Sequence, residues 1–208
     1  MPDTFDALEP RAALVAIARD FHDRGWMAGT SGNLSVRHDA DSFWITASGC
    51  PKGRLNGGDF VRVAVADCTE LERGDPQSRL SAESSIHCAI YQLFATAGAC
   101  LHVHTVDATL VSLRAAETSA GLALPPIEML KGLDIWEQHP QVDLALFENT
   151  LEVPRIAAAI RQRFGAQAPR VPALLIRGHG VTVWGETLQQ AYNRVEVVEF
   201  VLSYLARA

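Results

Sequence analysis

Strand-like and helix-like segments follow one another along this chain without the strict alternation that builds a parallel sheet. After an amphipathic stretch at residues 11–24, three short strand-like runs come in succession before the next helical run. Parallel strands need a long crossover between them, whereas consecutive strands pair antiparallel through short turns. The order of segments therefore predicts an α/β protein whose central sheet is mostly antiparallel and is covered by helices.

Apolar periodicity and turn residues set the expected boundaries. In the first helix, Leu14, Ile17, Ala18 and Phe21 recur at helical spacing, and Gly25 ends the helix. Helices are expected at residues 11–24, 82–97, 107–116, 153–164 and 187–206, with Ser81 and Thr187 as the caps of the second and the last. Strands are expected at the end of residues 28–37 and at 42–46, 61–66, 99–105, 142–147, 171–176 and 181–184. Residues 72–81 and the segment after Pro125-Pro126 are expected to be loops.

Length and composition fit one ordinary domain over residues 1–208, because single cores serve chains of up to roughly 250 residues. Apolar residues make up 48% of the chain and charged residues 20%, which supports a sizeable core. The net charge of −6 argues against a nucleic-acid surface, which needs a basic patch. Because the chain has no apolar run of the length that spans a bilayer, no membrane partner is expected.

The amino-terminal segment and the cysteines indicate the compartment. The first ten residues contain acids and no apolar core, so they do not resemble a secretory signal. Cys50, Cys68, Cys88 and Cys100 are far apart and form no CxxC pair. We therefore expect four free thiols in a reducing cytoplasm.

Three histidines form the sharpest chemical pattern. His102 and His104 are two residues apart in a predicted strand, so both imidazoles project from the same face while Val103 turns into the core. His179 lies between Gly178 and Gly180, which allow a sharp turn directly after a strand. Neutral imidazole suits Zn²⁺, and a catalytic zinc commonly has three protein ligands and an open position. The alternative is two partly buried histidines at a sheet edge and a third in a solvated turn.

The remaining histidines, His22, His38, His87 and His139, are expected to be structural or solvated.

Small polar residues in three turns supply candidate donors for an anionic ligand. Turns of this kind can hold a phosphate or carboxylate through N–H groups, and a helix N-terminus also favours anions. The candidates are Ser31, Gly32 and Asn33, then Ser48, Gly49 and Lys52, and finally Ser81. A glycine-serine turn is often only a turn, but three of them beside a candidate metal site indicate a phosphorylated substrate.

Five segments together resemble the class II (zinc) aldolase/adducin-head superfamily, over about residues 11–205. These segments are TSGNLSVR, ITASG, SAE at residues 81–83, HVHT and RGHGVTVWGETL. Within the superfamily, IEMLKG, FENT and the arginine before GHG resemble the dehydratase branch, which acts on 5-methylthioribulose 1-phosphate in methionine salvage.

The resemblance implies a three-layer α/β/α fold and a homotetramer in which a neighbouring subunit helps to complete the site. It also implies one Zn²⁺ per subunit, held by His102, His104 and His179. The acid/base glutamate of the dehydratase branch matches Glu128, and that of the aldolase branch matches Glu83. This chain has both glutamates, so the resemblance leaves the assignment open between them, and Glu83 is the second candidate. It has Ala82 where the aldolase motif has a second phosphate-binding serine, which argues against transferring the aldolase phosphate site.

The chemistry explains why such a substrate needs these groups. Removing the carbon-3 proton beside a ketone creates a costly enediolate, which a Lewis acid stabilises while a carboxylate moves the proton. We expect Glu128 to be this carboxylate, because an apolar PPIEML context should raise its pKa. An aldolase or epimerase would use the same metal site, and a metal-free adducin-like interaction module is the non-catalytic alternative.

Overall fold

The computed structural model describes residues 4–208, which contain one nine-stranded sheet in the order β4-β3-β2-β1-β5-β9-β8-β7-β6. Every neighbouring pair is antiparallel except β7 and β8. The predicted mostly antiparallel sheet is therefore confirmed. The strands are β1 (Asn33–Arg37), β2 (Ser42–Thr46), β3 (Phe60–Ala64), β4 (Glu70–Arg73), β5 (Ala99–Val103), β6 (Gly121–Ala123), β7 (Asp143–Phe147), β8 (Ala173–Ile176) and β9 (Gly180–Gly185).

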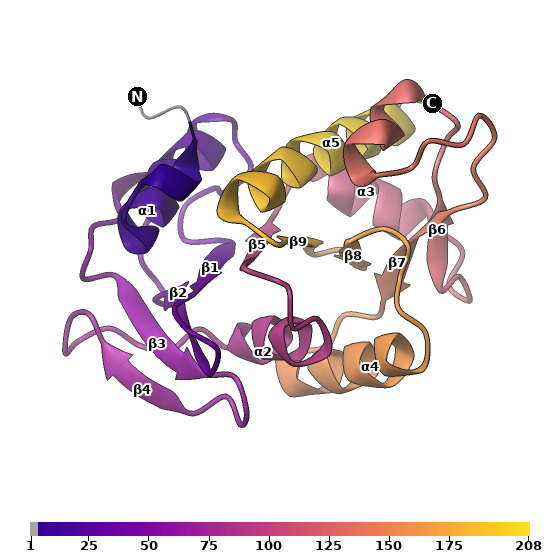
Figure 1. Ribbon diagram of the computed structural model, residues 1–208. Helices are drawn as coiled ribbons and strands as arrows, with labels where there is room; N and C mark the ends of the chain where they lie inside the picture. The colour runs from indigo at the N-terminus through magenta and orange to yellow at the C-terminus, as the bar shows by residue number, and fades with distance from the viewer. Residues whose placement is uncertain (1–3) are drawn as a thin grey trace.

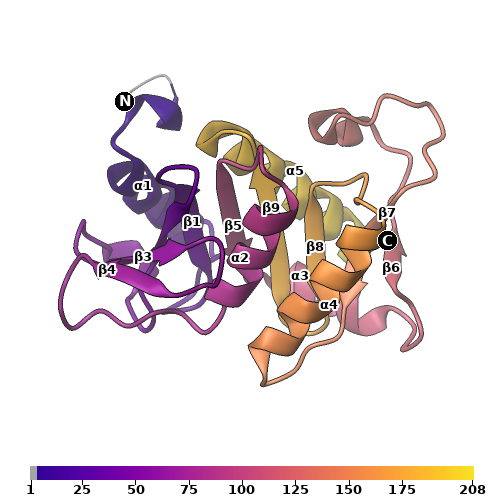
Figure 2. The same cartoon turned by 60° about the horizontal axis from the view of Figure 1, so that its bottom comes forward.

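Helices cover both faces of this sheet, as Figures 1 and 2 show. The helices are α1 (Pro10–Asp23), α2 (Ser84–Leu93), α3 (Val106–Arg114), α4 (Val153–Ala166) and α5 (Leu188–Arg207), with short 3₁₀ turns η1 (Phe5–Ala7), η2 (Lys52–Arg54) and η3 (Glu128–Leu133). One buried apolar cluster joins one sheet face to α1, α3 and α5, and a second joins the other face to α2 and α4. These are the three α/β/α layers that the resemblance implied.

Local sequence signals account for the end of α1 and the start of α5. Gly25 adopts φ +77° directly after the last residues of α1, as its predicted role as a helix stop requires. Thr187 caps α5, because its hydroxyl accepts the N–H of Gln190 at 3.2 Å. The prediction that Ser81 caps the second helix is wrong. That helix begins later, at Ser84, and its N-cap position is Glu83.

Three other expectations are corrected. Residues 72–81 are not all loop, since β4 pairs with β3 as an exposed edge strand. The segment after Pro125-Pro126 contains η3, and β6 precedes it. Cys68 and Cys88 form a disulfide, which ties the β3–β4 turn to α2, so the expectation of four free thiols is wrong for this pair. The two cysteines are 20 residues apart in the sequence, so the sequence alone did not indicate that their Cα atoms lie 6.0 Å apart.

Among residues 4–208, no helix combines the length and apolar character that crossing a membrane requires.

Glu199 of α5 gives the fold a testable pH dependence. Its side chain is 4% exposed, and burial raises its pKa to about 7. The folded chain therefore holds this proton more tightly than the unfolded chain, so stability falls as the pH rises from about 4.5 to 7 and is flat above. We expect Glu199→Gln to raise Tm at pH 8 by roughly 5 °C and to change it much less at pH 4.5. Thermal unfolding at both pH values tests this, and an equal change at both would contradict it.

Candidate metal centre

His102 lies on β5, near the middle of the sheet, where close strand pairing fixes its position. Its direct cross-strand partners are Asn33 on β1 and Thr182 on β9. Residues two apart in a strand share a face, so His102 and Cys100 both project toward the layer of α2 and α4. Val103 packs into the opposite core, as the sequence predicts.

His104 follows the end of the strand, and its backbone N–H donates to the carbonyl of Trp26 at 2.9 Å. The Nε2 atoms of His102 and His104 lie 2.9 Å apart, so the two rings turn toward one point.

His179 reaches the same point from the turn between β8 and β9. Gly178 adopts φ +61°, a left-handed conformation that glycine accommodates without strain. Gly180 allows the turn to approach β5 closely, because a Cβ at this position would lie 2.2 Å from the carbonyl oxygen of Val103. The ring centroid of His179 is 4.5 Å from that of His104 and 5.1 Å from that of His102. The predicted convergence of the three histidines is confirmed by this geometry.

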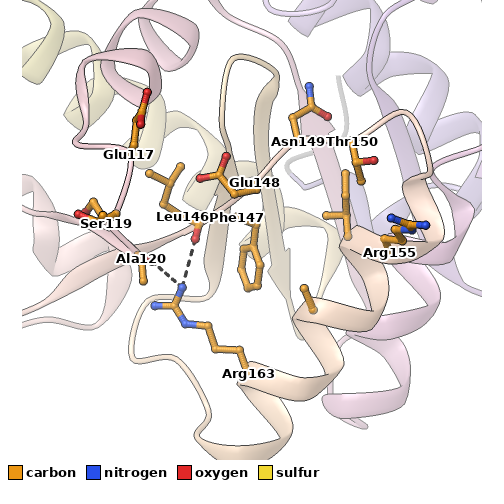
Figure 3. A pocket seen from close by; sticks show the side chains of 13 residues that line it. Glu117, Ser119, Ala120, Leu146, Phe147, Glu148, Asn149, Thr150, Arg155 and Arg163 are labelled. Atoms are coloured by element: carbon orange, nitrogen blue, oxygen red, sulfur yellow. Dashed lines mark hydrogen bonds between the residues drawn. The ribbon is translucent and has the colours of Figure 1, made fainter.

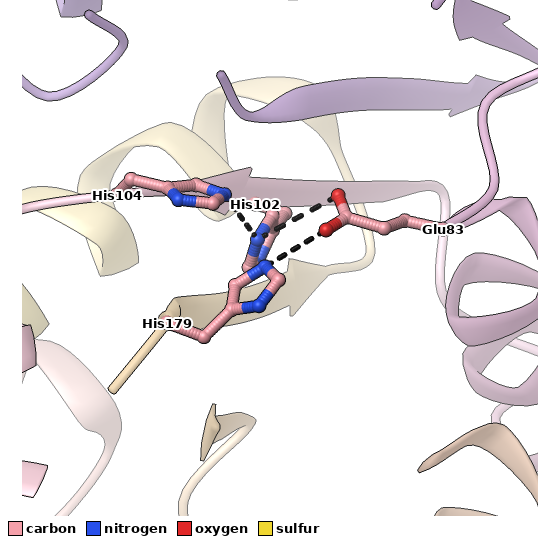
Figure 4. A group of neighbouring side chains, drawn as sticks. All are labelled: Glu83, His102, His104 and His179. Atoms are coloured by element: carbon pink, nitrogen blue, oxygen red, sulfur yellow. Dashed lines mark hydrogen bonds and ion pairs between the residues drawn. The ribbon is translucent and has the colours of Figure 1, made fainter. Parts of the chain in front are cut away.

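Glu83 completes the cluster from the residue that precedes α2. Its Oε1 lies 2.8 Å from Nε2 of His179, and its Oε2 lies 3.7 Å from Nε2 of His102. One ligand atom from each of the four side chains lies within 4.8 Å of the others. Figure 4 shows the carboxylate and the three rings facing a common centre. Glu83 was predicted from the aldolase motif, and the structure brings it to the histidines.

This donor set fits a divalent metal. Burial lowers the pKa of His102 to about 4 and that of His104 to about 3, so both rings are neutral and expose lone pairs at neutral pH. Burial alone would raise the pKa of Glu83, but His102 and His179 hold it well below its usual value. Zinc–nitrogen bonds of about 2.0–2.1 Å in a tetrahedron place nitrogens roughly 3.3 Å apart. The Nε2 atoms of His102 and His104, 2.9 Å apart, are close to this spacing, and all four ligand atoms lie within 4.8 Å of one another.

A further contact orients the most buried imidazole of the cluster. Nδ1 of His102 lies 2.9 Å from the hydroxyl of Thr182, so Nε2 is the ring nitrogen that faces the other histidines. Thr182 was not predicted as a site residue from the sequence. Its position opposite His102 follows from the register of β5 and β9.

The candidate anion donors lie on loops that are joined to this cluster. The ammonium group of Lys52 donates to the carbonyls of Thr30 at 2.8 Å and Cys50 at 3.0 Å. Lys52 is 2% exposed, and burial lowers its pKa. The N–H of Ser48 donates to the carbonyl of Arg79 at 2.8 Å, which ties the second donor turn to the loop before Glu83.

The other candidate donors differ in how many hydrogen atoms they have left for a ligand, and the one hydroxyl hydrogen of Ser31 is already used. Gly32 and Gly49 adopt φ +77° and +76°. The Ser31 hydroxyl donates to the carbonyl of Ala28 at 2.7 Å, and the Ser81 hydroxyl accepts the N–H of Glu83 at 3.3 Å. The Asn33 side chain contacts Glu83 and His87, so one amide hydrogen remains for a ligand. Phosphate binding by these residues stays a prediction.

Glu128 is outside the cluster. It opens η3, its side chain is 84% exposed, and its Oε1 accepts from the ammonium group of Lys131 at 2.7 Å. This hydrogen bond lowers its pKa. The expectation of a raised pKa is therefore wrong, because the apolar neighbours in the sequence do not enclose the carboxylate. Its catalytic role stays a prediction.

Arg177 is hydrogen-bonded to the FENT segment, residues 147–150. Arg177 donates to Glu148 at 2.8 Å and to the carbonyls of Ser112 at 2.8 Å and Ala115 at 3.0 Å. These bonds tie the turn that carries His179 to β7 and α3. Glu148 also lines a surface cavity of about 490 Å³ at the end of β7, which Figure 3 shows. None of the residues lining it belongs to the histidine cluster.

The chain is similar to a known protein family, to named proteins and to solved structures. Residues 12–205 match the model of the Class II Aldolase and Adducin N-terminal domain. A Microcystis aeruginosa protein named methylthioribulose-1-phosphate dehydratase is 54% identical over 201 residues, covering 96% of each chain. A protein of that name from Leptospira biflexa is 41% identical and covers 97% of this chain and 99% of its own. The crystal structure of YgbL from Escherichia coli superposes with a TM-score of 0.77 at 26% identity, over 93% of this chain and 86% of YgbL.

Proposed function

Because the chain belongs to the class II aldolase and adducin N-terminal domain family, we propose that it is a zinc-dependent hydro-lyase of methionine salvage. It converts 5-methylthioribulose 1-phosphate to 5-methylthio-2,3-dioxopentyl phosphate. The observation that carries the metal-dependent chemistry is the convergence of three imidazoles and one carboxylate. The names of two near-full-length relatives support the substrate. The family match over residues 12–205 supports one domain over the whole chain.

His102, His104 and His179 would hold one Zn²⁺ per subunit, with Glu83 as a fourth group that substrate oxygens can replace. Bound zinc supplies a Lewis acid that stabilises negative charge on the oxygens of a 2-ketose. Thr182 would fix the ring of His102 in this arrangement.

A carboxylate moves the protons. It takes the carbon-3 proton and returns a proton to the carbon-4 hydroxyl, whose C–O bond breaks as water leaves. The resulting enol then tautomerises to the diketone. We assign this transfer to Glu128, which matches the dehydratase branch, and we assign Glu83 to the metal. Glu83 touches His179 and has a lowered pKa, which makes it a better ligand than proton acceptor.

Glu128 is 84% exposed on η3 and is not part of the histidine cluster of its own subunit. We propose a homotetramer in which Glu128 of one subunit serves the metal centre of its neighbour. Apolar side chains exposed on α3 and α5 support such an interface. They are Val106, Leu110, Leu113, Phe200 and Tyr204. Light scattering of the purified protein should give the mass of four 22.6-kDa chains, and a monomer would contradict the assembly.

The phosphate group is assigned to the loops that carry Ser31, Gly32, Asn33, Ser48, Gly49, Lys52 and Ser81. We also propose that the protein acts in the cytoplasm. The charge of a phosphorylated substrate supports this location, because a phosphate dianion does not cross a lipid bilayer unaided.

Lys52 offers a direct test of the phosphate assignment. We expect Lys52→Met to raise KM by about 10- to 100-fold, since a hydrogen bond to a charged group is worth roughly 1.5–3 kcal/mol. Steady-state kinetics measure the change, and metal content should stay constant. Because Lys52 also donates to two carbonyls, Tm is measured in parallel. A normal KM in the folded variant would remove Lys52 from the phosphate site.

Product analysis tests the proposed reaction against its alternatives. The purified protein, incubated with 5-methylthioribulose 1-phosphate, should release the diketone. An aldehyde with dihydroxyacetone phosphate would identify an aldolase, and an isomeric ketose phosphate would identify an epimerase. A stable protein that binds no metal and leaves the substrate unchanged would identify an adducin-like interaction module.

A further inference from the structure

A buried polar chain lies between β1 and α2, behind Glu83. Asn33 and Ser35 are two apart on β1 and share one sheet face, while His87 and Tyr91 are four apart on α2 and share one helix face. The exposed fractions of these four side chains are all 3% or less. Four polar groups in such a position are costly unless each is hydrogen-bonded.

The hydrogen bonds form one continuous path. The Tyr91 and Ser35 hydroxyls are 2.8 Å apart, and the Ser35 hydroxyl lies 2.7 Å from Nδ1 of His87. Nε2 of His87 contacts Oδ1 of Asn33, and the Asn33 amide nitrogen donates to Oε2 of Glu83. The path therefore ends on the carboxylate that faces the histidine cluster (Figure 4).

The direction of every bond follows from the groups at the Glu83 end. An ionised carboxylate only accepts, so the NH₂ group of Asn33 faces Glu83 and its oxygen faces His87. That oxygen also only accepts, so Nε2 of His87 carries the hydrogen. Burial lowers the pKa of His87 to about 4, so its ring is neutral and Nδ1 is a bare acceptor.

The single Ser35 hydrogen is therefore assigned to Nδ1 rather than to the Cys100 carbonyl, which is farther away at 3.2 Å. Tyr91 then donates to Ser35. All four donors point toward Glu83, an arrangement in which each bond strengthens the next.

We propose that His87 is a positioning residue of the metal centre: acting through Asn33, it fixes the Glu83 carboxylate toward His102 and His179 and thereby raises the affinity of the cluster for zinc. The assignment rests on Glu83 being the fourth group of the proposed zinc site. It replaces the expectation that His87 serves only packing or solvation.

Zinc affinity is the first readout, measured by titration of the metal-free protein with a competing chelator. We expect His87→Leu to weaken binding by about 10- to 100-fold, as for other residues that orient metal ligands. His87→Gln keeps an N–H near the position of Nε2 and should bind zinc more tightly than the Leu variant. Ile86→Ala, a neighbouring core change on the same helix, is the control: it lowers Tm and leaves zinc affinity unchanged.

A double-mutant cycle separates positioning from general destabilisation. If His87 acts through Asn33, then His87→Leu should change zinc affinity by less than about twofold in an Asn33→Ala background. The proposal would be overturned if His87→Leu weakened zinc binding by the same factor in the Asn33→Ala background as in the wild type. It would also be overturned if the Leu variant and the wild type bound zinc equally well.

The tautomer of His87 provides a readout that needs neither a variant nor a substrate. Long-range ¹H–¹⁵N NMR of the folded wild-type protein at pH 7 should show a neutral ring protonated at Nε2. A ring protonated at Nδ1, or a charged imidazolium, would overturn the proposal. A protein with this tautomer and tight zinc binding, but with no dehydration of the substrate, would refute the proposed function and leave the role of His87 in place.

Discussion

Replacing His104 with alanine is expected to remove the bound metal and to lower kcat/KM for dehydration by about a thousandfold or more. The imidazole of His104 supplies one of three ring nitrogens, and its Nε2 lies 2.9 Å from that of His102. Loss of one ligand leaves a site too weak to retain the ion, and Lewis-acid stabilisation is worth several kcal/mol, or about a factor of ten for each 1.4 kcal/mol.

Metal analysis and steady-state kinetics on the same preparation check this result. His139→Ala is the matched control, because His139 is an exposed histidine outside the cluster. It should keep its metal and its activity. A His104→Ala variant that retains both zinc and turnover would show that the cluster is not the metal centre.

The second large effect separates the two glutamates. We expect Glu128→Gln to lower kcat by about 10²–10⁴-fold with normal zinc content, because the amide cannot transfer the proton. We expect Glu83→Gln to lower zinc affinity as well as activity, since its carboxylate lies 2.8 Å from Nε2 of His179.

Zinc titration and kcat measured for both variants test the assignment. Near-normal dehydration by the Glu128 variant would disprove the role of Glu128. A Glu83 variant with full zinc affinity and no turnover would instead make Glu83 the proton carrier.

Subunit mixing tests whether Glu128 serves a neighbouring centre. Inactive Glu128→Gln and His104→Ala proteins are mixed, dissociated and reassembled. If each centre combines histidines of one subunit with Glu128 of another, some mixed tetramers contain an intact centre and regain activity. No recovery, with mixed tetramers verified by native mass spectrometry, would contradict a shared site.

The sequence predicted the convergence of the three histidines because strand periodicity and glycine geometry act locally. Because His102 and His104 are two residues apart in the sequence, their side chains lie on the same side of the sheet. The glycines around His179 permit the turn that carries it. The mostly antiparallel sheet followed in the same way, from the order of its segments. These features depend on neighbours in sequence.

What the sequence could not predict depends on contacts between distant segments. The relation of Glu83 to the cluster depends on where α2 begins, and the displaced start of that helix also invalidated the cap at Ser81. The environment of Glu128 was inferred from its sequence neighbours, whereas Lys131 and solvent set its pKa. His87 has no signal of its own, because its partners Ser35 and Asn33 are 52 and 54 residues away.

Removal and return of the metal tests whether zinc at the histidine cluster carries the dehydration. The purified protein is stripped with a chelator, assayed for diketone release from 5-methylthioribulose 1-phosphate, and titrated with Zn²⁺. We expect turnover to be lost with the metal and to return in full at one zinc per subunit. Full turnover by the metal-free protein would contradict it.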